Sequence, residues 1–172
     1  EVPVWEEGLC IQCSKCALVC PHAAIRAKAF PEAALSGAPE EFRHSPWKGR
    51  DLPAGTRYSI AVSPDDCTGC RLCVEVCPAK DPATPGRLAL NMAPVAGVRE
   101  RQARDFGVFS SLPQTDRTML DLKSVKSSQL LEPLFEYSGA CAGCGETPYL
   151  KVLSQLYGDR LVIANATGCS SI

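Results

Sequence analysis

The chain has 172 residues, of which 45% are hydrophobic and 22% are charged, and its formal net charge at pH 7 is −1. This hydrophobic content supports a packed core and excludes a chain that is disordered throughout. The near-zero charge, without a cluster of lysine or arginine, argues against nucleic acid and against an anionic membrane as partners. No stretch approaches the ~18 consecutive apolar residues of a membrane-spanning helix. We therefore expect one large or two small domains and no membrane insertion.

Both termini are interpreted as cuts through a longer polypeptide. The chain begins with "EVPVWEEG", without a methionine or the basic region of a signal peptide. It stops at Ile172, shortly after a cysteine-bearing turn. The expectation is therefore that the sequence is a fragment.

The eleven cysteines are an odd number, which a pure disulfide framework cannot satisfy. Two runs, "CIQCSKCALVC" at 10–20 and "CTGCRLCVEVC" at 67–77, each hold four cysteines at the same spacing, and a proline follows each run. Three thiols at two-residue gaps converge on one side of a tight loop, which suits one metal centre better than distant disulfide bridges. We therefore expect free thiols in a reducing, cytoplasmic setting.

The repeated spacing is that of a bacterial protein with two [4Fe–4S] clusters. In that arrangement three cysteines of one run bind one cluster, and the fourth cysteine binds the other cluster. The predicted ligands are Cys10, Cys13, Cys16 and Cys77 for cluster 1, and Cys67, Cys70, Cys73 and Cys20 for cluster 2. Structural zinc is the alternative, but zinc usually takes two C-x2-C pairs and would leave the third and fourth cysteine of each run without a role.

The segments around the two runs predict an α+β fold with an internal repeat, each half being a short strand, a cluster loop and a short helix. Alternating residues in "RYSIAVSPDDC" predict a strand that leads into the second loop, whereas "CPHAAIRAKAF" after the first run indicates a short helix or turn. Residues 31–55, rich in proline, glycine and charge, are typical of an inserted surface loop. We assign His22 and His44 to the surface or to the surroundings of the clusters, not to the ligand sets.

The remainder of the chain predicts a connector followed by a second domain. Residues 95–132 hold no cysteine, and "VRERQARDF" within them predicts a short helix in a connector that packs along the next domain. Pro148 and Gly158 mark the ends of an amphipathic helix, and "LVIANA" predicts a short buried strand after it. Loop, helix, strand and loop in this order indicate the start of an α/β domain.

The last three cysteines surround this helix: Cys141 and Cys144 precede it, and Cys169 lies on the loop after the predicted strand. Three interpretations compete. The first two cysteines could form a thioredoxin-like dithiol, which would leave Cys169 without a role. A structural zinc site or a third iron–sulfur cluster would use all three thiols, but each lacks a fourth ligand here. The residue pattern leaves the choice open.

Three motifs in this order, "CIQCSKCALVCPHAAIR", "DDCTGCRLCVEVCPAK" and "LFEYSGACAGCGETPY", resemble pyruvate:ferredoxin (flavodoxin) oxidoreductase, a multidomain thiamine-diphosphate enzyme. The resemblance implies a 2[4Fe–4S] ferredoxin-like domain with an inserted loop at 1–94, a connector at 95–132 and the beginning of the α/β thiamine-diphosphate-binding domain at 133–172.

The same resemblance implies roles for the third motif. Cys141, Cys144 and Cys169 would hold a third [4Fe–4S] cluster, with a fourth ligand beyond Ile172. Glu146 and Cys169 would contact thiamine diphosphate. From its position alone, Glu146 would be read as an acidic residue at a helix N-terminus, where the helix dipole favours it.

The implied reaction belongs to anaerobic metabolism: oxidative decarboxylation of a 2-oxo acid, with pyruvate favoured, using thiamine diphosphate, Mg²⁺ and coenzyme A. Electrons would pass through the clusters to ferredoxin or flavodoxin, and the intact enzyme would be a homodimer. The family's glycine–aspartate–glycine metal motif and its upstream domains are absent from this sequence, so we assign no catalytic residue here and expect no turnover by this chain alone. The alternative is a non-catalytic ferredoxin-type electron carrier with a C-terminal appendage.

Overall fold

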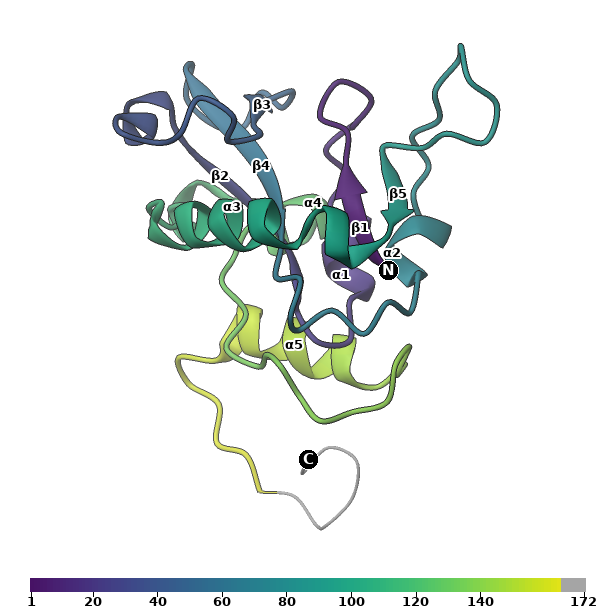
Figure 1. Cartoon of the computed structure of the whole chain (residues 1–172). Helices are drawn as coiled ribbons and strands as arrows, with labels where there is room; N and C mark the ends of the chain where they lie inside the picture. Colours follow the sequence, from purple (N-terminus) through teal and green to yellow (C-terminus); the bar gives the residue numbers. More distant parts are fainter. Residues whose placement is uncertain (165–172) are drawn as a thin grey trace.

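The computed structural model describes residues 1–164 and contains two small antiparallel sheets (Figure 1). Strand β1 (Val2–Trp5) pairs with β5 (Leu90–Ala93), so that the two ends of the cysteine-rich region lie side by side. The second sheet has the order β2-β4-β3, with β2 (Ile25–Pro31) along β4 (Thr56–Val62) and the two-residue β3 (Ser45–Pro46) on the other edge. The fold is therefore α+β, as predicted.

The predicted internal repeat is present. In each half a strand leads into a cysteine loop, a short helix and a second strand. The helices are α1 (Lys15–Val19) and α2 (Leu72–Glu75), and each lies between the second and fourth cysteine of its run. They pack against each other beneath the two sheets. The strand predicted at Tyr58, Ile60 and Val62 is confirmed as β4.

One prediction for the first half is wrong, because residues 25–31 form strand β2 instead of a short helix or turn. Alanine favours helices, but here Ile25 pairs with Val62, Ala27 with Ile60 and Ala29 with Tyr58. These β2 residues are buried. Pairing and burial along the full length of β4 outweigh the local helical preference.

The inserted segment 31–55 is also more than a surface loop. It contains a short 3-10 helix, η1 (Glu32–Leu35), and the strand β3. Phe42 within it is 4% exposed and packs with Phe109 and Leu112. The insertion therefore contributes to the core. Its few apolar residues are widely spaced among proline, glycine and charged residues, so they form no periodic pattern in the sequence.

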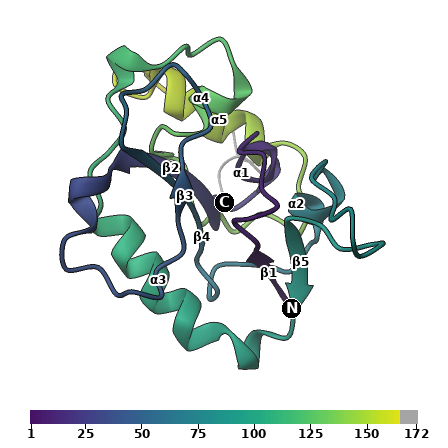
Figure 2. The ribbon, with the colours of Figure 1, turned by 90° about the horizontal axis from the view of Figure 1, so that it is seen from above.

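The predicted connector folds onto the cysteine-rich region. Its main helix, α3 (Arg99–Ser111), lies across β4, and Figure 2 shows it along one side of the sheet. Two 3-10 helices, η2 (Val95–Gly97) and η3 (Arg117–Met119), flank α3, and α4 (Val125–Ser128) follows them. Leu120 and Leu130 belong to the same core as the cysteine loops.

The helix predicted after the third cysteine motif is confirmed as α5 (Thr147–Tyr157), with a proline in its first turn and Gly158 after its last residue. The buried strand predicted at 161–166 is wrong for residues 161–164, which lie in no strand and are largely exposed. No strand of the described part of the chain lies beside this segment to pair with it. No helix within residues 1–164 is long and apolar enough to cross a membrane.

Candidate metal centres

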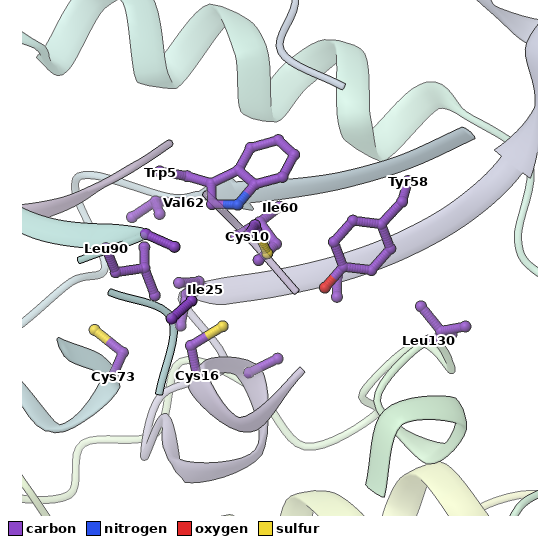
Figure 3. Close-up of a cluster of buried hydrophobic side chains, with 14 of the residues drawn as sticks. Trp5, Cys10, Cys16, Ile25, Tyr58, Ile60, Val62, Cys73, Leu90 and Leu130 are labelled. Carbon is purple, nitrogen blue, oxygen red and sulfur yellow. The ribbon is translucent and has the colours of Figure 1, made fainter. Parts of the chain in front are cut away.

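The fold brings the eight cysteines of the two runs into two cavities. One cavity is lined by Cys10, Cys13, Cys16 and Cys77, and the other by Cys20, Cys67, Cys70 and Cys73. Each set contains three cysteines of one run and the fourth cysteine of the other run. In Figure 3, Cys16 and Cys73 come from the two short helices below the core residues Ile25 and Leu90. The exchange of the fourth cysteine follows from the packing of α1 against α2.

The two loops share an unusual backbone conformation. Gln12 and Gly69, two residues after the first cysteine of each run, have φ values of 58° and 68°. Ser14 and Arg71, two residues further on, have φ values of 57° and 68°. This left-handed conformation turns backbone N–H groups towards the thiols, and the N–H of Gln12 donates to Sγ of Cys10 at 3.3 Å. A left-handed conformation of non-glycine residues at matching positions, here Ser14 and Arg71, is typical of functional loops.

Burial raises the pKa of four of these thiols, those of Cys10, Cys16, Cys67 and Cys73, and makes them difficult to ionise in the absence of a cation. Burial and then neighbouring thiols raise the pKa of Cys16 well above its ordinary value. Burial, followed by Cys20, Cys67 and Cys70, raises the pKa of Cys73 to about 12. A cationic metal group would compensate the buried thiolates, because metal binding displaces thiol protons. The electrostatics of the cavities therefore fit a metal centre.

The indole group of Trp5, beside the first cavity, also fits a metal centre. The pKa of Cys10 is raised by burial, and the indole N–H of Trp5 opposes this rise. The same buried N–H has no hydrogen-bond partner of regular geometry, and Figure 3 shows the ring above Cys10. A buried donor without a partner costs free energy, so a thiolate or sulfide acceptor at this place would satisfy it.

The cysteines surround each cavity without converging on one point. Among residues 1–164, no three Cys, His, Asp or Glu side chains are close enough together to share a single metal ion. A cubane cluster distributes its four thiolates over different irons, so it suits ligands that are spread around a cavity. His22 is buried and lines the second cavity, where its Nδ1 lies 3.1 Å from the carbonyl oxygen of Ser138. His44 lines neither cavity.

The third motif lies on the loop that enters α5. Cys141 is exposed and Cys144 is partly exposed, and the N–H of Cys144 donates to the carbonyl of Cys141 at 3.0 Å. Hydrogen bonds from the backbone N–H groups of Thr147 and Glu146 lower the pKa of Cys144, as expected for a thiol at a helix N-terminus. Glu146 precedes the helix without a side-chain capping bond. Cys169 lies outside the described residues.

The third motif is adjacent to the second cavity. Gly143 has a φ of 76°, and a β-carbon placed on it would lie 3.9 Å from Cβ of Cys70. Just before the motif, the N–H of Tyr137 donates to the carbonyl of His22 at 2.9 Å. Contacts of this kind arise from the tertiary packing and have no sequence signature.

Two lysines close to the cysteine loops were not singled out by the sequence. Lys48, from the insertion, donates from Nζ to the carbonyl of Cys10 at 2.7 Å. Lys151, from α5, donates to carbonyls at the end of α1. Burial lowers the pKa of Lys151 to about 8, and the nearby Cys20 and Cys16 oppose this shift. A signal for Lys151 was visible in the sequence, because polar residues recur at helical spacing along α5 at 147, 151, 154 and 155.

The class defined by this fold and these cavities is that of proteins with two cysteine-ligated iron–sulfur sites. Residues 9–80 match the family described as "4Fe-4S dicluster domain". Curated relatives extend the match over the whole chain. The chain is 55% identical over 172 residues to the pyruvate-flavodoxin oxidoreductase of Nostoc and 53% identical to the probable pyruvate-flavodoxin oxidoreductase of Escherichia coli, with 100% of the chain covered in both cases. It is 48% identical over 171 residues, 99% of the chain, to the pyruvate:ferredoxin oxidoreductase of Moorella thermoacetica.

Over its whole length the chain is therefore similar to part of the pyruvate:ferredoxin (flavodoxin) oxidoreductases. It spans 14% of the length of the Nostoc and Moorella proteins and 15% of that of the Escherichia coli protein. The predicted [4Fe–4S] chemistry of the cysteine runs agrees with the matched dicluster domain.

Proposed function

We propose that residues 1–94 hold two [4Fe–4S] clusters and relay electrons between them. The observation that carries this proposal is the pair of cavities, each lined by three cysteines of one run and the fourth of the other. Cluster 1 takes Cys10, Cys13, Cys16 and Cys77, and cluster 2 takes Cys67, Cys70, Cys73 and Cys20. Apolar surroundings and backbone N–H donors are the features through which a protein sets the reduction potential of such clusters.

We further propose that this segment serves a larger 2-oxo acid oxidoreductase. The names of the relatives support pyruvate as substrate and flavodoxin or ferredoxin as electron acceptor. In the intact enzyme thiamine diphosphate, with Mg²⁺, supplies the carbanion chemistry, and coenzyme A accepts the acyl group. In this proposal the intact enzyme is a homodimer in a reducing, cytoplasmic compartment. The ten free cysteines among residues 1–164 support the reducing setting.

The residues from 133 onwards begin the thiamine-diphosphate-binding domain in this proposal. Cys141, Cys144 and Cys169 bind a third [4Fe–4S] cluster together with a ligand outside these 172 residues, and Glu146 and Cys169 contact thiamine diphosphate. The lowered pKa of Cys144 supports a thiolate at this loop. The approach of Gly143 to Cys70 supports electron transfer from this motif to cluster 2.

Metal and sulfide analysis tests the two-cluster proposal directly. The chain is loaded with iron and sulfide under anaerobic conditions, and we expect about eight irons and about eight acid-labile sulfides per chain from the first two sites. The colour should bleach on reduction by dithionite. A chain that takes up zinc without sulfide, or that stays colourless, would contradict the proposal.

The role in a larger enzyme is tested on the intact parent protein. Coenzyme A-dependent decarboxylation of pyruvate, coupled to reduction of flavodoxin or ferredoxin, is the expected activity. The isolated 172 residues, loaded with clusters, should show none. Activity with neither pyruvate nor another 2-oxo acid, in a parent protein that holds its clusters, would favour the simple electron carrier.

A further inference from the structure

Helix α5 is attached to the cysteine-rich region by its polar side. Its buried residues are Thr147, Lys151, Ser154 and Gln155. On the outer side Tyr149 is 78% exposed, and Leu153 and Tyr157 are also exposed. This reverses the usual order for a helix on a protein surface, in which apolar residues face the core. The placement of α5 therefore depends on specific hydrogen bonds more than on hydrophobic area.

Lys151 makes the contacts that join α5 to the cluster loops. It is 2% exposed, and its Nζ donates to the carbonyl oxygens of Ala17, of Leu18 at 3.0 Å and of Cys20 at 3.3 Å. These carbonyls lie at the C-terminal end of α1 and just beyond it, where the last carbonyls of a helix lack partners within the helix. The lysine therefore satisfies the backbone at the point where the chain passes from one cavity to the other.

The hydrogen bonds of Lys151 define the charge of its amino group. A carbonyl oxygen only accepts hydrogen bonds, and three such oxygens surround Nζ. A neutral amine has two N–H groups, whereas an ammonium group has three. The geometry therefore places a buried positive charge in contact with the backbone of Cys20, one turn after Cys16.

The same region receives the segment before the third motif. His22 interacts with that segment twice: its carbonyl accepts from the N–H of Tyr137, and its Nδ1 lies 3.1 Å from the carbonyl of Ser138. Residues 17–22 are thus held between the approach to Cys141 and the helix that follows Cys144. This junction brings the third motif against the second cavity.

We propose that Lys151 is a positioning residue for electron transfer: it holds the third cysteine motif beside the cluster bound by Cys20, Cys67, Cys70 and Cys73, and its charge favours the reduced state of that cluster. Reduction by one electron makes a cluster more negative, so a buried cation nearby stabilises the reduced form. The inference rests on the proposed binding of [4Fe–4S] clusters.

The test compares cluster-loaded variants of the full 172-residue chain. Lys151→Met removes the charge, Lys151→Gln keeps an N–H donor without the charge, and Lys151→Arg keeps the charge. Lys28→Met is the matched control, because Lys28 is also buried and also donates from Nζ to backbone carbonyls, those of Phe109 and Leu112, without contacting a cysteine. Reduction by dithionite is followed at a series of fixed potentials by electron paramagnetic resonance.

We expect both neutral variants to lower the ratio of reduced to oxidised cluster 2 at a fixed potential by about threefold or more; a tenfold change corresponds to 59 mV for a one-electron couple. Lys151→Arg and Lys28→Met should stay close to wild type. Unchanged potentials in loaded neutral variants, or equal shifts in Lys28→Met, would overturn the proposal.

Failure of a variant to load its clusters is also informative. If both neutral variants lose cluster 2 while Lys151→Arg and Lys28→Met retain it, the positioning role stands, because the loss then follows the charge at the cluster loop and not the burial of a lysine. If Lys28→Met loses it equally, the role of Lys151 is merely structural and the inference fails. If the wild-type chain binds no iron and sulfide, the proposed function fails before Lys151 is tested.

Discussion

The two cysteine cavities share one loop conformation but differ in what covers them. In the first loop Gln12 and Ser14 are completely buried. Of their counterparts in the second loop, Gly69 is partly exposed and Arg71 is exposed. The difference comes from segment 31–55, which lies over the first loop, and the second half of the repeat has no similar cover among the described residues.

Gln12 links the insertion to the first loop. Its side chain donates to Ser45 at 3.1 Å and to the carbonyl of Pro46 at 2.7 Å, and it accepts from the N–H of Lys48 at 2.8 Å. The second loop contacts the third cysteine motif at Cys70. Solvent exposure and hydrogen bonding adjust the potentials of iron–sulfur clusters. Identical cysteine spacing therefore produces two cavities with different surroundings, one shielded by the insertion and one next to the third motif.

Exchange of the fourth cysteine between the runs is the feature whose loss should have the largest effect. Cys20→Ser should remove cluster 2 and leave about four irons per chain, because a serine hydroxyl is a poor substitute for a thiolate. Cys77→Ser should remove cluster 1 and leave the same amount of iron. Iron and sulfide analysis and electron paramagnetic resonance measure the result.

A second substitution identifies the cluster that is lost. Adding Cys70→Ser to Cys20→Ser should change the iron content little, because both residues belong to the same site. Adding Cys13→Ser should remove most of the remaining iron. The reverse pattern would mean that each run binds its own cluster with all four of its cysteines. The proposed exchange of Cys20 and Cys77 would then be wrong.

Gln12→Gly makes the first loop resemble the second and should have a smaller effect. Glycine adopts the φ of 58° without strain, so the N–H donor to Cys10 should be kept. The three side-chain hydrogen bonds to the insertion are lost, and we expect the free energy of unfolding to fall by about 1–3 kcal/mol. Urea unfolding measures this change, and hydrogen exchange should show faster opening at residues 45–48.

Gly69→Ala is the converse control. A β-carbon at this position would lie 2.9 Å from the carbonyl oxygen of Glu1, and the φ of 68° disfavours alanine. Loading of the second cluster should therefore suffer in this variant, whereas both clusters should remain in Gln12→Gly. Loss of the first cluster from Gln12→Gly, with its N–H donor intact, would show that the cover formed by the insertion is required for binding.

The cysteine pattern could be interpreted from sequence because ligand chemistry constrains the spacing tightly. It predicted both cysteine sets, including the exchange of Cys20 and Cys77, and the structure brings the same sets together. Helix α3 was also predicted, from "VRERQARDF". Helix α5 was predictable because it has clear end signals in Pro148 and Gly158. These features depend on short-range rules, which a single sequence contains.

The incorrect predictions concern contacts between distant segments. Residues 25–31 are rich in alanine, and only the presence of β4 alongside makes them a strand. An amphipathic helix is expected to bury its apolar side, whereas α5 buries its polar side. Lys48 and Lys151 reach the cysteine loops across 38 and 131 residues of sequence. The polar spacing along α5 is visible in the sequence, but no local pattern identifies the distant carbonyls that these two lysines contact.

The smallest predicted effect concerns Lys28, which lies between the sheet and the end of α3, away from both cavities. Burial lowers the pKa of Lys28 to about 8, and its ordinary value is 10.5. Between these two values the unfolded chain binds more protons than the folded chain, so this group makes stability rise with pH from about 8 to about 10.5. Below pH 8 the ammonium is charged in both states and contributes no slope.

Lys28→Met removes the donor to two carbonyls near the end of α3, at 2.8 and 2.9 Å, and we expect a net loss of about 1 kcal/mol near pH 7. The difference in unfolding free energy between wild type and this variant should widen as the pH is raised from 8 to 10. Urea unfolding at pH 7.5, 8.5 and 9.5 measures it. A difference that stays constant over this range would show that the Lys28 ammonium is not penalised by burial.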